Sequence, residues 1–145
     1  MQEDTMIVGC LEQVAFPSLK IDEVMAKIDT GAYSGALHCH FYEMVERDGQ
    51  SILRFQPIHE NSEIIETADY KTAYVTSSSG HRDKRYIIET DVLIHGKRYT
   101  MSIGLTDRTD LKMDVLIGRR FLRKNNMLVD VRIGAEFDED GGGKE

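Results

Sequence analysis

The chain contains no tryptophan, two cysteines and two prolines among its 145 residues. Two thiols, Cys10 and Cys39, build no disulfide framework and suit a reducing compartment. The stretch from Met1 to Thr5 is polar and acidic, and the sequence has no long apolar run of the kind that a signal peptide or a transmembrane helix needs. We therefore expect a cytoplasmic protein without a membrane partner, although a secreted or anchored protein trimmed of its leader would have the same sequence pattern.

Positive charge is also in deficit, because 18 Lys and Arg residues face 25 Asp and Glu residues and the net charge is −7. A nucleic-acid partner is disfavoured, since phosphate contact requires a positive field. The cations gather in two short runs, at 82–85 (Arg82, Lys84, Arg85) and at 119–124 (Arg119, Arg120, Arg123, Lys124). Such runs are usually solvated surface, and the alternative is that they recognise an acidic peptide.

Short stretches with alternating apolar and polar residues dominate the chain and are typical of half-buried β-strands. Asp48-Gly49 and His95-Gly96 predict tight hairpin turns, because glycine readily adopts the positive φ that such turns need. Arg120 to Asn125 gives the one convincing helical turn. We predict an all-β fold in which a closed, barrel-like sheet protects the strand edges.

The length fits a single domain. We place its boundaries at residues 6–133. Residues 1–5 are predicted to be a flexible N-terminus, and residues 134–145 a disordered tail rich in acidic residues and glycine.

Asp29 follows an apolar, strand-like stretch and opens the tight turn Asp29-Thr30-Gly31-Ala32. Gly31 allows close backbone approach and unusual dihedral angles, and Ala32 keeps bulk away from the acid. A carboxylate on a bare, rigid turn is suited to activating water. The triplet alone is weak evidence, because Asp-Thr-Gly occurs by chance in many surface turns.

A second stretch, Val115 to Leu122, runs from an apolar triplet into Gly118-Arg119 and a short helix. The two stretches in this order resemble the retropepsin-type aspartic proteases, and most closely a bacterial branch labelled ATP-dependent zinc proteases and encoded near ATP-grasp glutamate ligases. The similarity covers about residues 6–131. Its other motifs are Ile7-Val8-Gly9, Ala36-Leu37-His38, Ser78-Ser79-Gly80, Leu105-Thr106-Asp107-Arg108 and Leu128-Val129-Asp130.

This resemblance implies a retropepsin (acid protease) fold with one short helix near the C-terminus, and an aspartic-type endopeptidase without a cofactor. Such chemistry needs two carboxylates that share one proton. The sequence has one Asp-Thr-Gly, so a homodimer must place Asp29 opposite its copy. The resemblance implies that Thr30 forms a hydrogen bond across the dimer interface. It also implies that Gly31 approaches the substrate and that Ala32 flanks the substrate.

One hairpin must cover the acid, and the candidates are the Asp48-Gly49 turn and the loop that contains Ser79 and Gly80. The link to glutamate ligases suggests an acidic or glutamylated peptide as substrate. Arg108 and Arg119, together with Arg82, are the candidates for contacts to its carboxylates.

The sequence departs from the family pattern beside the turn. Tyr33 stands where retropepsins usually carry an acid, and Ser34-Gly35 stands where the bacterial branch has a Thr-Ser pair. These departures bear on specificity and on activity. A catalytically silent peptide-binding or dimerisation module of the same fold is therefore an alternative.

A zinc-dependent hydrolase is a second alternative, because His38 and His40 are two residues apart on a predicted strand. A catalytic zinc site needs three protein ligands, and nothing near these histidines in the sequence supplies an obvious third. The sequence therefore predicts no metal site.

Overall fold

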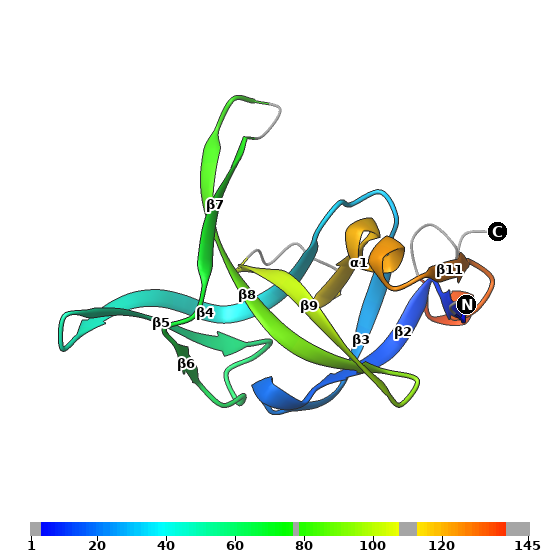
Figure 1. Ribbon diagram of the computed structural model, residues 1–145, viewed down its shortest axis with the longest axis horizontal. Coiled ribbons are helices and arrows are strands. Elements are labelled where there is room, and N and C mark those ends of the chain that lie inside the picture. The colour runs from blue at the N-terminus through cyan, green and yellow to red at the C-terminus, as the bar shows by residue number, and fades with distance from the viewer. Residues whose placement is uncertain (1–3, 77–78, 108–112, 139–145) are drawn as a thin grey trace.

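The computed structural model describes residues 4–76, 79–107 and 113–138 (Figure 1). Arg108 lies outside this range. The described residues form strands with a single short α-helix, which confirms the predicted all-β class. The strands are β1 (Met6–Gly9), β2 (Leu11–Phe16), β3 (Ile21–Asp29), β4 (Gly35–Arg47), β5 (Gln50–Pro57), β6 (Ile65–Thr67), β7 (Lys71–Thr76), β8 (Arg82–Ile94), β9 (Lys97–Thr106), β10 (Val115–Gly118) and β11 (Met127–Asp130). The helices are α1 (Arg119–Lys124) and two 3-10 turns, η1 (Pro17–Leu19) and η2 (Ala135–Phe137).

Six strands close into a barrel. β10 pairs in parallel with β3, and antiparallel pairings then lead from β3 through β2 and β8 to β9. β9 pairs in parallel with the first half of β4, and β4 returns to β10 in antiparallel register, which closes the ring. The predicted barrel-like closure is therefore confirmed.

The barrel core comes from the apolar positions that alternate along its strands. Met101, Ile103 and Leu105 of β9 are buried, and the exposed or partly exposed residues between them face outward. Val115 and Ile117 are fully buried in β10, which has neighbours on both edges. An uninterrupted apolar run is typical of such a central strand, and this position was predicted from the sequence.

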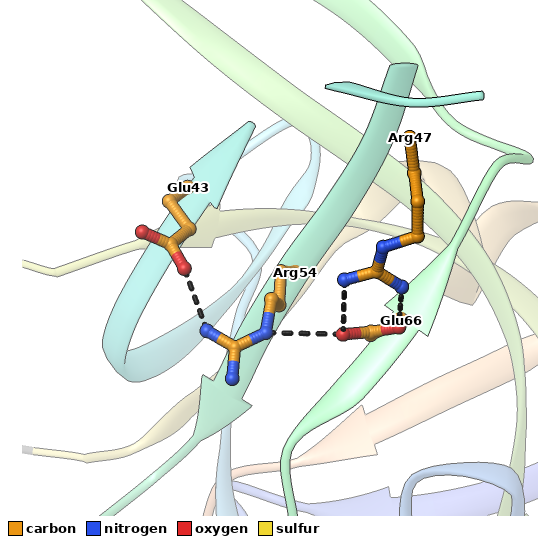
Figure 2. Close-up of polar contacts among 4 residues, drawn as sticks. All are labelled: Glu43, Arg47, Arg54 and Glu66. Atoms are coloured by element: carbon orange, nitrogen blue, oxygen red, sulfur yellow. Dashed lines mark hydrogen bonds and ion pairs between the residues drawn. The ribbon is translucent and has the colours of Figure 1, made fainter. Parts of the chain in front are cut away.

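The second half of β4 leaves the barrel and forms a smaller sheet with β5 and β6. Ion pairs lie across this sheet (Figure 2). Arg54 bonds to Glu43 at 2.6 Å and to Glu66 at 3.0 Å, and Arg47 bonds to Glu66 at 2.6 Å. The bond from Arg47 is the main cause that lowers the pKa of Glu66. The two partners of each ion pair lie on different strands, so the network links β4, β5 and β6 and supports their register.

The β7–β8 hairpin projects from the barrel because β8 continues past its barrel pairings to pair with β7 (Figure 1). The picture shows this hairpin rising on the same side as the loop between β3 and β4, whereas the β4–β5 hairpin extends sideways. Both residues of the Asp48-Gly49 turn have positive φ, as the sequence predicts for a tight hairpin.

β1 and β11 form a separate two-stranded parallel sheet, in which Met6 lies opposite Met127. The apolar stretch at 6–16 is thus two strands. The break falls at Cys10, whose backbone N–H donates to the carbonyl of Ile133 at 2.8 Å. The Asn126 side chain donates to the carbonyl oxygen of Asp4 and to Oγ1 of Thr5, each at 3.2 Å. Residue 134 begins the turn into η2, and residues 139–145 lie outside the described part of the chain.

Candidate active site

Asp29 is the last residue of β3, and its partner in the parallel register is Gly118, the last residue of β10. The chain then turns sharply: the Ala32 N–H donates to the Asp29 carbonyl oxygen at 3.1 Å, and the Gly31 N–H donates to Oδ1 of Asp29 at 3.1 Å. The Asp29 side chain is partly exposed. The fold therefore presents one oriented carboxylate at the end of a barrel strand, as predicted.

Gly31 does not have a positive φ, so this turn does not use the left-handed conformation that glycine allows. A Cβ there would lie 3.3 Å from Oδ1 of Asp29, so a larger residue would press on the carboxylate and displace it by a few tenths of an ångström. Thr30 is exposed on the outside of the turn. A bare backbone beside the carboxylate leaves room for a substrate chain.

The first residues of α1 hold the far side of this turn. The Arg119 N–H donates to the Ala32 carbonyl at 2.8 Å, and the Arg120 N–H donates to the Tyr33 carbonyl at 3.0 Å. These are the N–H groups that lack a partner at any helix start. The loop after Asp29 therefore caps the helix with its carbonyl groups, and the helix fixes the loop.

The Arg119 side chain strengthens the same attachment. Its Nη1 donates to the carbonyl oxygens of Gly31 at 3.1 Å and Thr30 at 3.4 Å. The guanidinium carbon lies 5.5 Å from the centre of the Tyr33 ring, and that of Arg120 lies 5.9 Å from it. Arg119 thus positions the Asp29 turn, while its predicted contact with substrate remains a prediction. The aromatic ring that replaces an acid after the turn packs with two cations.

Gly118 is the junction of β10 and α1, and a larger residue would fit there only if the neighbouring loop moved. A Cβ would lie 2.7 Å from the Tyr33 carbonyl oxygen and 2.8 Å from both the carbonyl carbon and oxygen of Ser34. The sequence indicated Gly118 as a strand end by the Gly118-Arg119 pair after an apolar triplet. The contact of Gly118 with the loop after Asp29 was not predicted.

Ser79 and Gly80 lie exposed in the turn between β7 and β8, and Gly80 has a φ of 88°. A cavity of about 200 Å³ reaches the base of this hairpin at Ala73 and Arg85, and it also reaches Ser34 and Gly35 beyond the Asp29 turn. No residue of the Asp48-Gly49 turn lines it. This geometry favours the β7–β8 hairpin among the two candidate covers.

His38 and His40 do not assemble with other ligands in the part of the chain that the structure describes, where no group of three His, Cys, Asp or Glu side chains is placed to hold a metal. His38 Nδ1 is buried without a hydrogen-bond partner in the described structure, and His40 is exposed. The register of β4 against β5 shifts between Cys39 and Phe41, so a bulge lies at His40.

A family model described as "Retropepsin-like aspartic endopeptidase RimB" matches residues 7–134. The chain belongs to the RimB-like family. The resemblance inferred from the Asp29 and Gly118 stretches is thereby confirmed, together with the retropepsin-like fold. A protein from Legionella pneumophila, Lpg0085, titled as a protein of unknown function (DUF785), has a similar solved structure. The TM-score is 0.71 at 26% identity, and the match covers 88% of this chain and 95% of that one.

Curated relatives of the RimB-like chain carry a different name. A protein from Shewanella pealeana, named a probable alpha-L-glutamate ligase, is 29% identical over 90% of this chain. One of the same name from Desulfotalea psychrophila is 23% identical over 92%. The chain spans 29% and 30% of the length of these two relatives. No helix among the described residues is long and apolar enough to cross a membrane.

Proposed function

We propose that this RimB-like chain is an aspartic endopeptidase that works as a two-fold homodimer. The observation that carries the proposal is the placement of Asp29, a partly exposed carboxylate on a turn that α1 and the Arg119 side chain hold rigid. Asp29 belongs to the single Asp-Thr-Gly of the sequence, so a second subunit is needed to supply a second carboxylate by this motif.

In the dimer the two Asp29 carboxyl groups share one proton, because two like charges at hydrogen-bonding distance cannot both ionise easily. The ionised carboxylate takes a proton from water as the water oxygen attacks the peptide carbonyl carbon. The neutral carboxyl gives its proton to the carbonyl oxygen. As the diol collapses, one of its hydroxyls gives a proton to the ionised carboxylate, the C–N bond breaks and the neutral carboxyl protonates the leaving amine, so one shared proton remains on the pair.

The terminal sheet supplies a surface for the second subunit. Ile7 of β1 and Leu128 of β11 lie opposite each other and are 52% and 61% exposed, and Val131 and Ile133 just beyond β11 are also exposed. A two-stranded sheet is marginal by itself, and each of these strands has one neighbour in the described sheet. Pairing with a copy would add strands to the sheet and cover its apolar face.

The proposed substrate is an acidic or glutamylated peptide, and the β7–β8 hairpin is its cover. Two observations support this substrate class: the chain is net acidic yet gathers cations at α1 and β8, and its relatives are named glutamate ligases. A functional link to an ATP-grasp glutamate ligase is part of the same proposal.

The first experiment pairs oligomeric state with cleavage of a peptide library. Asp29→Asn should reduce cleavage by about 10²–10⁴-fold, the usual contribution of a general acid or base. Asp22→Asn removes an exposed carboxylate from the same strand and should leave cleavage unchanged. Cleavage that survives in Asp29→Asn would refute the proposed chemistry.

A second pair of variants tests the interface by light scattering. Leu128→Asp places a charge on the terminal sheet and should weaken dimerisation by more than about tenfold, with loss of cleavage in parallel. Ile64→Asp changes an apolar residue that is 43% exposed and lies outside the terminal sheet. It should change neither dimerisation nor cleavage. A dimer that Leu128→Asp leaves intact would place the interface elsewhere.

The second candidate function is a peptide-binding module without catalysis. It is favoured by the curated relatives, in which the matching region is less than a third of a protein named as a ligase. For such a module, Asp29→Asn would bind acidic peptides as the unsubstituted chain does, and neither would cleave them.

A further inference from the structure

The cavity of about 200 Å³ is bounded by α1, by β9 and by the barrel end of the β7–β8 hairpin. Drug-sized ligands and cofactors occupy pockets of about 300–1,000 Å³, so this volume is better matched to one side chain of a longer ligand. The wall nearest the catalytic turn is formed by Ser34 and Gly35.

Three cations line this cavity, and they come from both basic runs of the sequence. Arg85 belongs to β8, whereas Arg120 and Lys124 are four residues apart on α1 and share one face of that helix. None of the three makes an ion pair with an acidic residue in the described ranges. Folding therefore brings positive charge without an ion-pair partner from β8 and α1 to one cavity, in a chain whose net charge is −7.

Apolar side chains also line the cavity. Ile87 of β8 is partly buried, and Met101 of β9 and Phe121 of α1 are 3% and 8% exposed. A ligand suited to such a cavity has a short apolar stem and an anionic end. A glutamate side chain has this form, because its two methylene groups can contact the apolar wall while its carboxylate meets the cations. Inorganic phosphate has no stem to place there.

The cavity is joined to the catalytic turn through α1. The Arg120 N–H donates to the carbonyl of Tyr33 at 3.0 Å, and Tyr33 precedes the lining residue Ser34. Asp29 lies at the other end of the same short loop. The cavity wall at Ser34 is thus five residues along the chain from Asp29, close enough in sequence for one peptide ligand to contact both.

We propose that this cavity is the site at which the protein binds a glutamate side chain of its peptide ligand, with Arg85, Arg120 and Lys124 as the cations that meet the carboxylate. The link to cleavage rests on the proposed peptidase function, whereas the binding itself does not. The site is distinct from the contacts predicted for Arg108 and Arg119.

The experiment uses the full chain with Asp29→Asn, so that no probe is cleaved, and titrates it by calorimetry with oligoglutamate and oligoglutamine peptides of equal length. Oligoglutamate should bind and oligoglutamine should bind at least roughly tenfold more weakly. Arg120→Gln with Lys124→Gln should weaken oligoglutamate binding roughly tenfold or more, and Arg85→Gln should act in the same direction. Arg123→Gln removes one charge from the same helix outside the cavity and is the matched control.

A second readout locates the bound peptide. The side-chain methyl of Met101, labelled with carbon-13, should shift on addition of oligoglutamate and not on addition of oligoglutamine. Because Arg120 and Lys124 are exposed, their variants should fold even if Arg85→Gln does not.

The proposal is overturned if both peptides bind equally, if Arg123→Gln weakens binding as much as the Arg120 and Lys124 changes, or if inorganic phosphate competes as well as oligoglutamate. Failure of the peptidase is a separate result. Oligoglutamate that binds at Met101 but is never cut by the unsubstituted chain refutes catalysis alone. Cleavage of neutral peptides without oligoglutamate binding refutes the cavity site alone.

Discussion

Gly118→Ala is the substitution that tests most directly how the Asp29 turn is held. The backbone of Gly118 has φ −90° and ψ 175°, which alanine adopts without strain, so the added methyl group acts only through its contacts. Those contacts are with backbone atoms of Tyr33 and Ser34 at 2.7–2.8 Å. Carbon atoms normally approach other heavy atoms to about 3.5 Å, so the loop must move away from the helix by several tenths of an ångström.

Overpacking of this kind costs about 1–3 kcal/mol of unfolding free energy. A domain of 145 residues has an unfolding entropy of roughly 0.3 kcal/mol per kelvin, so the midpoint of thermal unfolding should fall by about 3–10 °C. The shift also lengthens the bonds from the Arg119 and Arg120 N–H groups to Ala32 and Tyr33, which are now 2.8 and 3.0 Å. Any cleavage activity should therefore fall together with stability.

Thermal unfolding followed by circular dichroism measures the effect, and Gly104→Ala is the control. A Cβ at Gly104 lies 3.7 Å from the Gly35 carbonyl oxygen and 3.9 Å from that of Tyr86, which are ordinary contacts. That variant should unfold at the original temperature or slightly above it, because alanine restricts the unfolded chain. Equal unfolding temperatures for the two variants would refute the claim that the approach of α1 to the loop is tight.

Two further predictions concern single ionisable groups. Burial, with the Asp107 carboxylate as a second cause, raises the pKa of the Cys39 thiol to about 12. A thiol reagent at pH 8 should therefore modify Cys10 in the folded protein and reach Cys39 only after unfolding. Rapid modification of both thiols in the folded protein would contradict the structure. Hydrogen bonds from Arg132 lower the pKa of Asp130 to about 2, so this pair stabilises the fold above about pH 4 and ceases to do so as the pH falls towards 2. Arg132→Gln should therefore be less stable than the parent chain at pH 7, and this difference should shrink as the pH falls through 2; a difference that is the same well below pH 2 as at pH 7 would exclude this cause.

Much of the fold could be predicted because most strands and turns have a recognisable local sequence pattern. Alternation along β9, the uninterrupted apolar run of β10 and the two turns with positive φ at Asp48-Gly49 and His95-Gly96 are properties of neighbouring residues. The polar and acidic segment at 60–69 has no such local pattern, yet it contains the three-residue β6. So short a strand is fixed by its pairing with β5 and by the Arg47 and Arg54 ion pairs, which no local pattern reveals.

In the candidate site, too, residues in local motifs could be predicted, and residues brought in by distant segments could not. Asp29, Gly31 and Gly118 were identified because they stand in compact motifs. The contribution of Arg85 to the cavity could not be predicted from the sequence. It depends on β8 lying beside β9 and on the position of α1, and these are contacts between segments far apart in the sequence. The predictions for Ser79, Gly80 and Arg119 as substrate contacts concern a bound state, so they remain predictions, and Arg108 lies outside the described residues.

The pairing of β1 with β11 has a consequence for how this fold can be combined with others. The two strands run in the same direction, with Met6 beside Met127 and Gly9 beside Asp130, and the bond from Cys10 to Ile133 keeps the residues after β11 next to β1. A domain of this kind can be inserted into a loop of another protein without forcing the flanking segments apart. It also suits circular permutation: a linker from the residues after β11 back to the start of β1, with new ends opened at the Asp48-Gly49 turn, should preserve the barrel.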